Sequence, residues 1–311
     1  MNSLLRRLEW PDHPVDVVLD TDTFNEIDDQ FALAYLLCSG EKLRLQAIYA
    51  APFQNRHASD PKQGMERSFS EILKILALMK RTDLVPLVCK GSEGYLEDEN
   101  SFRESQAARD LVRRAMQHTP ENPLYVIAIA AITNVASAIR MEPAIVDRIV
   151  IVWLGGNALH WPDNREFNLF QDVAAARIVF GCGAALVQLP CMGVVSAFTT
   201  TKPELEYWLR GKNALCDYLV DVTCEEAAAC NISGTWSRSI WDVTAVGWLI
   251  DPSFTSDYLM PSPIPQYDHH FSTDPTRHPI RYVYSINRDL LFRDLFKKIA
   301  GASGGSEESD T

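Results

Sequence analysis

Four aspartates and one glutamate lie close together near the start of the chain, in the stretch VVLDTDTFNEIDDQFALAYLL at residues 17–37. They follow an apolar run typical of a strand and precede an apolar run typical of a helix. Carboxylates this close repel one another unless something positive lies among them. The pattern therefore raises the hypothesis of a cation bound at a strand-to-helix turn.

The same turn was tested against two other motifs. Asp20 and Asp22 have the spacing of the D-x-D-x-[TV] motif of haloacid dehalogenase phosphatases, but Phe24 stands at its fifth position. Phe24 and Asn25 also occupy positions where an EF-hand loop needs an oxygen ligand and a glycine. An EF-hand is excluded, and a metal-dependent phosphohydrolase stays as the alternative enzyme hypothesis.

Asp28 and Asp29 stand where the predicted helix begins. Consecutive side chains at a helix start diverge by about 100° around the axis. One of the two carboxylates can therefore face a metal while the other faces a ligand hydroxyl. Either aspartate alone can instead cap the helix, because Asp is favoured there. Capping explains the whole cluster less well than a shared site does.

Short apolar runs alternate with longer runs of helical spacing along the first 200 residues. The strand-like runs are 15–19, 45–50, 84–89, 124–129, 149–154 and 185–189, and the helix-like runs are 30–37, 64–79, 105–118 and 172–180. This order predicts an α/β fold with an open, mainly parallel, Rossmann-like sheet and helices on both faces. Ligands of such sheets bind at the carboxyl ends of the strands, which is where the acidic turn lies.

The rest of the chain predicts a helical C-terminal elaboration. Residues 203–250 have helical character, and a Pro-rich loop at 260–270 precedes a strand-like run at 280–286 and a last helix from Arg288. We expect one domain over residues 1–300. The small, polar and acidic end, residues 301–311, predicts a disordered tail.

Composition narrows the class of partner. The formal charge is −12, which argues against a nucleic acid or an anionic membrane as partner. Seven cysteines without paired spacing indicate reduced thiols. The start of the chain lacks a signal-peptide pattern, and no apolar run has membrane-spanning length. We therefore expect a cytoplasmic protein that binds a small molecule.

Four segments in order resemble the inosine-uridine preferring nucleoside hydrolase family. They are DTDTFNEIDDQFALAYLL, AAITNVASAI, GGN followed by REFNLFQDVAAARIVF, and WDVTAVGWLIDP. The opening motif is two residues longer than the D-x-D-P-G-x-D-D-A usual in the family, and it lacks the Pro-Gly. The resemblance implies a calcium-dependent hydrolase of the N-glycosidic bond of ribonucleosides, assembled as a homodimer or homotetramer.

The resemblance also implies a metal site. Asp20 is expected to bind the metal and to act as the base that activates water, Asp29 to bind the metal through both oxygens, and Asp242 to be the distal ligand. The backbone carbonyl of Ile129 aligns with the family's carbonyl ligand. An all-oxygen set of this kind suits a hard cation such as Ca²⁺.

The residues expected to contact the substrate come from four parts of the chain. The resemblance implies that Asp28, Glu166 and Asn168 hold ribose hydroxyls and that Asn55 lines the pocket. Trp241 stands where family members that protonate the departing base often have His. Tryptophan has no proton to donate at neutral pH, although it can stack on a base. Packing at the helix start is the other explanation for Trp241.

Three further features have structural explanations. Asp172 is expected to cap the helix that follows it, and Gly155 and Gly156 to permit a tight turn. Asn157 and Asn164 both remain candidates for a sugar contact. Besides the hydrolase, the hypotheses are the phosphohydrolase and a binding protein of the same fold that does not turn over its riboside.

Overall fold

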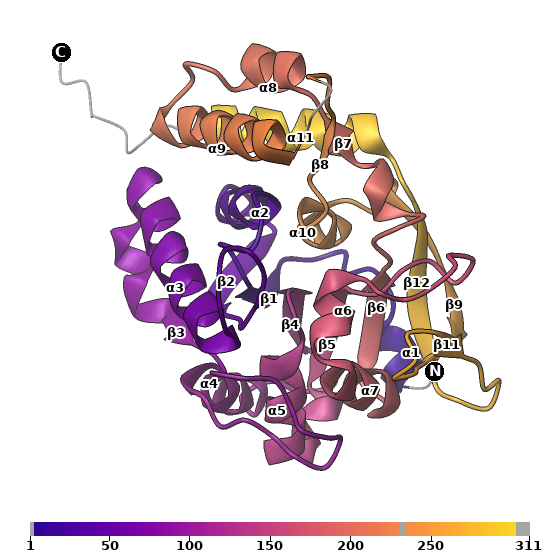
Figure 1. The fold of residues 1–311 in the computed structure, drawn as a ribbon. Coiled ribbons are helices and arrows are strands. Elements are labelled where there is room, and N and C mark those ends of the chain that lie inside the picture. Colours follow the sequence, from indigo (N-terminus) through magenta and orange to yellow (C-terminus); the bar gives the residue numbers. More distant parts are fainter. Residues whose placement is uncertain (1–2, 231–233, 303–311) are drawn as a thin grey trace.

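The computed structural model describes residues 3–230 and 234–302. Eight strands form one open sheet in the order β3-β2-β1-β4-β5-β6-β12-β9 (Figure 1). The strands are β1 (Val15–Thr21), β2 (Leu43–Ala50), β3 (Val88–Lys90), β4 (Leu124–Ile129), β5 (Ile149–Leu154), β6 (Ala185–Leu189), β9 (Thr255–Pro261) and β12 (Pro279–Ile286). All neighbours pair in parallel except β12 and β9, which are antiparallel. The predicted α/β class with a mainly parallel sheet is confirmed.

Helices cover both faces of the sheet. They are α1 (Ser3–Arg7), α2 (Asp28–Leu37), α3 (Pro61–Leu78), α4 (Gln106–Ala115), α5 (Thr133–Met141), α6 (Phe167–Gln171), α7 (Val173–Gly181), α8 (Lys202–Trp208), α9 (Ala214–Cys230), α10 (Val243–Ile250) and α11 (Arg288–Ala300). The apolar residues of α4, α5 and α7 belong to one core, and those of α2, α3 and α10 to a second core. In Figure 1, α8, α9 and α11 form an outer layer over α2 and α10.

The strands in the middle of the sheet have the predicted bounds. Every residue of β4, β5 and β6 is buried. Strands covered by helices on both faces are continuously apolar, so their sequences mark both ends clearly. Two two-stranded sheets lie outside the main one, β7 (Thr199–Thr200) with β8 (Arg238–Ser239) and β10 (Ile264–Pro265) with β11 (Phe271–Ser272).

Two predicted elements differ from the structure. Residues 84–89 were expected to be a strand, but Thr82–Leu87 is a 3-10 helix and only the short β3 follows it. Pro86 lies inside that helix; proline lacks the N–H that a strand ladder needs, and its φ suits a helical turn. The edge strand β9 was not predicted, because its residues are only partly buried. Of the predicted tail, residues 303–311 lie outside the described residues.

The order of the strands creates one crevice at their carboxyl ends. The chain passes from β1 through α2 to β2 on one side of β1, whereas β4 pairs with β1 on the other side. Ligands bind at such a reversal of strand order in open α/β sheets. Within residues 3–230 and 234–302, no helix is long and apolar enough to cross a membrane.

Candidate metal centre and binding cavity

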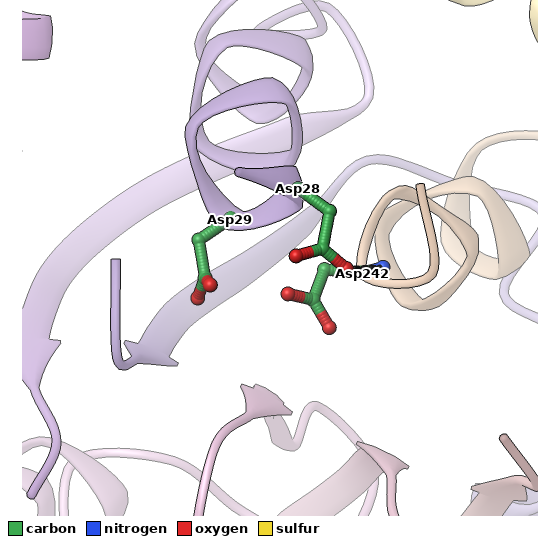
Figure 2. A group of neighbouring side chains, drawn as sticks. All are labelled: Asp28, Asp29 and Asp242. Atoms are coloured by element: carbon green, nitrogen blue, oxygen red, sulfur yellow. Dashed lines mark hydrogen bonds between the residues drawn. The ribbon is translucent and has the colours of Figure 1, made fainter. Parts of the chain in front are cut away.

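Three aspartates converge at this crevice. Asp28 and Asp29 are the first residues of α2, and Asp242 directly precedes α10, which packs beside α2. Each contributes one carboxylate oxygen, and these oxygens lie within 4.8 Å of one another (Figure 2). The N-terminal ends of two helices carry partial positive charge, which favours carboxylates there. Sequence positions more than 200 residues apart thus form one acidic group.

Burial raises the pKa of all three carboxylates, although hydrogen bonds from Asp242 oppose the rise at Asp28. Burial, followed by the charges of its neighbours, holds the pKa of Asp29 and of Asp242 well above the usual range. The Asp242 backbone N–H donates to Asp28 Oδ2 at 3.2 Å, and Thr21 Oγ1 donates to Asp29 Oδ1 at 2.5 Å. Asp29 Oδ2 has no hydrogen-bond partner in the described structure. These donors satisfy only part of the group.

Asp22 shares this environment, and Asp20 differs from it in having a hydrogen-bond donor. Both carboxylate oxygens of Asp22 are buried without a hydrogen-bond partner among the described residues. Burial raises the pKa of Asp22, and the charges of Asp29 and Asp28 raise it further. Oδ1 of Asp20 accepts a hydrogen bond from Asn134 Nδ2 at 2.8 Å, whereas its Oδ2 is buried without a partner among the described residues. Burial raises its pKa to about 7 against that bond. Asp22 was not predicted as a metal ligand, although its D-x-D spacing with Asp20 is a signal in the sequence that could have indicated it.

The donor set fits a hard cation. Buried carboxylate oxygens without partners cost free energy unless a cation or a proton compensates them. The donors at this centre are all oxygens, and a set of oxygen ligands suits Ca²⁺ better than it suits transition metals. Ile129, whose carbonyl was predicted as a ligand, ends β4 beside Thr21 of β1 and lines the adjoining cavity.

A cavity of about 500 Å³ opens over the acidic group. This is within the range of pockets that bind small molecules. Seven predicted site residues line it: Asp28, Asn55, Ile129, Glu166, Asn168, Trp241 and Asp242. Asp20 and Asp29 are fully buried and do not reach the cavity wall.

Glu166 and Asn168 come from the start of α6. The Glu166 carboxylate accepts the backbone N–H groups of Gly156 at 2.8 Å and of Asn168 and Leu169 at 2.9 Å. Burial raises the pKa of Glu166 to about 7 although these bonds oppose the rise. Asn168 Nδ2 donates to the Leu154 carbonyl at 3.1 Å, at the end of β5. Both side chains are held in place by backbone groups.

The turn after β5 gives Glu166 its first donor. Gly156 has φ +76°, and a Cβ there would lie 2.9 Å from Asn164 Oδ1, so the predicted tight turn is confirmed. Asn157 lines the cavity, whereas the Asn164 side chain accepts the Asn157 backbone N–H at 2.7 Å. Of the two, only Asn157 is at the cavity wall, where its side chain donates to the Asp163 carbonyl at 3.1 Å and accepts the Met192 N–H at 3.1 Å. Asp172 caps α7 by accepting the Ala175 N–H, as expected.

The longer opening loop contributes two lining residues that the sequence analysis did not assign. Asn25 and Glu26 both face the cavity. Asn55 Nδ2 donates to Asn25 Oδ1 at 2.7 Å, and Asn55 Oδ1 accepts the His57 N–H at 2.7 Å. The Asn55 side chain therefore fixes the opening loop through its hydrogen bond to Asn25.

Comparisons with known proteins agree with this arrangement. A family model described as inosine-uridine preferring nucleoside hydrolase matches residues 17–284. The pyrimidine-specific ribonucleoside hydrolase RihA of Salmonella typhimurium is 27% identical in an alignment of 193 residues that covers 55% of this chain and 58% of RihA. The match thus spans little more than half the length of that curated relative.

Two solved structures have the same fold. A plant nucleoside hydrolase, PpNRh1, has a TM-score of 0.75 and 19% identity, with 93% of this chain and 99% of that chain covered. A purine-preferring ribonucleoside hydrolase from Gardnerella vaginalis has a TM-score of 0.73 and 20% identity at the same coverage. At these identities the likeness establishes the fold.

Proposed function

Because the chain belongs to the inosine-uridine preferring nucleoside hydrolase family, we propose that it hydrolyses the N-glycosidic bond of ribonucleosides or related ribosides. One observation carries the proposal. Asp28 and Asp242 line a cavity large enough for a nucleoside, and Asp29, grouped with them, keeps a buried carboxylate oxygen without a partner. The relatives named above differ in base preference, so the preferred base is not part of the proposal.

We assign the metal ligands to Asp22, Asp29, Asp242 and the Ile129 carbonyl, with Ca²⁺ as the cation. Asp22 takes the place predicted for Asp20, because both of its oxygens lack partners, whereas one of the two Asp20 oxygens is engaged by Asn134. When bound, the cation neutralises the carboxylates and lowers the pKa of water at the site. Asp20 is buried beside Asp22 and is not assigned as a ligand.

The side chains around the cavity divide the remaining work. Asp22 accepts a proton from the water that attacks the anomeric carbon, since its oxygens are free to do so. Asp28, Glu166 and Asn168 hold the ribose hydroxyls. Positive charge develops on the ribose ring as the glycosidic bond breaks, and the surrounding carboxylates stabilise it. Each role follows from a group that lines or underlies the cavity.

The departing base receives no proton from Trp241. An indole N–H does not ionise at neutral pH, and stacking contributes only roughly 0.5–1.5 kcal/mol, much less than a general acid worth about 10²–10⁴ in rate. We therefore expect weak activity on inosine and uridine and much higher activity on a riboside with an activated leaving group, such as p-nitrophenyl riboside.

A release assay tests the proposed hydrolysis together with the assignment of Asp22 as the residue that accepts the proton from water. Free ribose is measured from a nucleoside panel and from p-nitrophenyl riboside, with Ca²⁺ or with a chelator. Asp22→Asn is expected to lower kcat by about 10²–10⁴ while the far-ultraviolet circular dichroism stays unchanged, whereas Asp20→Asn costs less. Phosphate release would support the phosphohydrolase instead. Tight nucleoside binding without any release would support a binding protein. This is the second candidate, because Trp241 stands where family members that protonate the departing base often have His.

A further inference from the structure

A carboxylate, a guanidinium and an indole form a chain of contacts at the wall of the cavity. Glu26, from the longer opening loop, forms an ion pair with Arg238 of β8. The guanidinium carbon of Arg238 lies 5.7 Å from the centroid of the Trp241 ring. The side chain of Arg238 is 16% exposed and that of Glu26 is 34% exposed. The ion pair is therefore largely shielded from water, which strengthens it relative to a surface pair.

Two of the three residues line the cavity. Trp241 and Glu26 line the cavity, whereas Arg238 is not among the lining residues. Arg238 thus contacts the ring without lining the cavity, whereas the Trp241 side chain reaches the cavity wall. Its backbone is fixed as well, because Arg238 pairs with Thr200 in the small β7–β8 sheet. The cation behind the indole is held at both its backbone and its guanidinium.

We propose that Glu26 and Arg238 are positioning residues that hold the Trp241 ring as the contact surface for an aromatic leaving group. This inference rests on the proposed function, because it assigns the leaving-group side of the same cavity. A ring held in advance loses little conformational freedom when a flat ligand packs on it. Aromatic rings gain from such packing beyond the area that they bury, whereas a saturated group does not.

The longer opening loop takes part in this arrangement. Glu26 belongs to the turn between Asp22 and Asp28 that is two residues longer than the usual motif, so the longer loop has a function in this chain. It supplies the carboxylate that fixes Arg238 behind the ring.

The test measures binding, so that it does not depend on turnover. The ligands are ribose and a C-nucleoside with a purine-like base, in which a carbon–carbon bond replaces the bond that would be hydrolysed. Calorimetry gives both dissociation constants for the wild-type protein and for Glu26→Gln, Arg238→Met, Arg238→Lys and Trp241→Ala. Arg238→Met is expected to weaken C-nucleoside binding roughly 3- to 30-fold and ribose binding less than about twofold. Arg238→Lys should restore part of the loss.

A similar triad elsewhere provides the matched control. Arg177 pairs with Glu99, and its guanidinium carbon lies 5.4 Å from the Tyr267 ring centroid, outside this cavity. Arg177→Met should leave both dissociation constants unchanged. In the double variant Arg238→Met/Trp241→Ala, binding should be no weaker than in Trp241→Ala alone, because the arginine acts through the indole.

Three results would overturn the inference. They are a wild-type protein that binds the C-nucleoside no more tightly than ribose, an Arg238→Met variant that loses both ligands equally, and additive effects in the double variant. The proposed function can fail separately. If the protein binds the C-nucleoside through Trp241 and Arg238 but releases no base from any nucleoside, the positioning role stands and the hydrolase proposal does not.

Discussion

At the scale of single residues, the partners of a carboxylate decide its role. Asp20 lies near the end of β1 and Asp22 directly follows this strand, and both are buried. Asn134 donates to Oδ1 of Asp20 and leaves its Oδ2 without a partner, whereas both oxygens of Asp22 lack a partner in the described structure. A carboxylate engaged by a neutral donor is a poorer base and metal ligand than a free one. This contrast moves the proposed base from Asp20 to Asp22.

Glu166 allows a prediction about pH and stability. Burial raises its pKa from the usual 4.5 to about 7. Between these values the folded protein keeps a proton that the unfolded chain has lost, so the free energy of unfolding falls as the pH rises. Glu166→Gln removes this dependence. The unfolding free energy of the variant minus that of the wild type should therefore rise by about 2–3 kcal/mol between pH 4.5 and 7.5.

Urea unfolding with a chelator present measures this difference at several pH values. The other buried carboxylates titrate in both proteins, so their contributions cancel in the comparison. Glu93, which is exposed and paired with Lys62, provides the control substitution Glu93→Gln, which should show no such trend. A difference between Glu166→Gln and wild type that is independent of pH would show that Glu166 ionises normally in the folded protein.

At the scale of elements, one side chain connects three parts of the sheet edge. Asn134, near the start of α5, donates to Asp20 of β1 at 2.8 Å. Its Oδ1 accepts the Ser92 N–H at 2.8 Å and the Ser92 hydroxyl at 2.9 Å, just beyond β3. All of these groups are buried. Asn134 therefore fixes how β1, β3 and α5 meet below the acidic group.

Asn134→Ala should lower the free energy of unfolding by about 2–4 kcal/mol, since each buried group that loses its partner costs about 1–3 kcal/mol. Urea unfolding, with the same slope for both proteins, measures the change. Asn122→Ala, at an exposed turn, is the control and should cost much less. A loss below 1 kcal/mol in Asn134→Ala, as roughly expected for a single surface contact, would contradict the connecting role.

At the scale of the whole molecule, an acidic chain buries several of its carboxyl groups together in one crevice. The chain has a formal charge of −12, and Asp22, Asp28, Asp29 and Asp242 are all buried within one crevice. The mutual repulsion of these groups opposes folding unless protons or a cation compensate it. Binding of a cation to the folded state alone therefore stabilises the protein.

Assembly as a homodimer or homotetramer stays a prediction.

Thermal unfolding tests this linkage. At pH 7.5, Ca²⁺ at about 100 times its dissociation constant should add about 2.7 kcal/mol of stability and raise Tm by several degrees over the chelated protein. Asp242→Asn should raise Tm in chelator, because a repelling charge is gone, and should lose most of the response to Ca²⁺. Glu93→Gln should keep the full response. An unchanged Tm in millimolar Ca²⁺ would exclude the proposed centre.

The sequence alone determined the fold class, the central strands and the family. Buried strands such as β4, β5 and β6 are apolar throughout, and this pattern depends on burial by neighbours on both faces rather than on details of packing. The acidic turn marked the site for a similar reason. Several carboxylates at one strand-to-helix turn have few explanations other than a bound cation.

Only the tertiary structure decided which aspartate is free and what the longer loop does. Hydrogen-bond partners such as Asn134 come from distant parts of the chain, and no local pattern indicates toward which of Asp20 and Asp22 they point. The contact of Glu26 with Arg238 joins residues 212 positions apart. Such pairings depend on how β1, α5 and β8 pack together, and packing is a property of the assembled chain rather than of any segment.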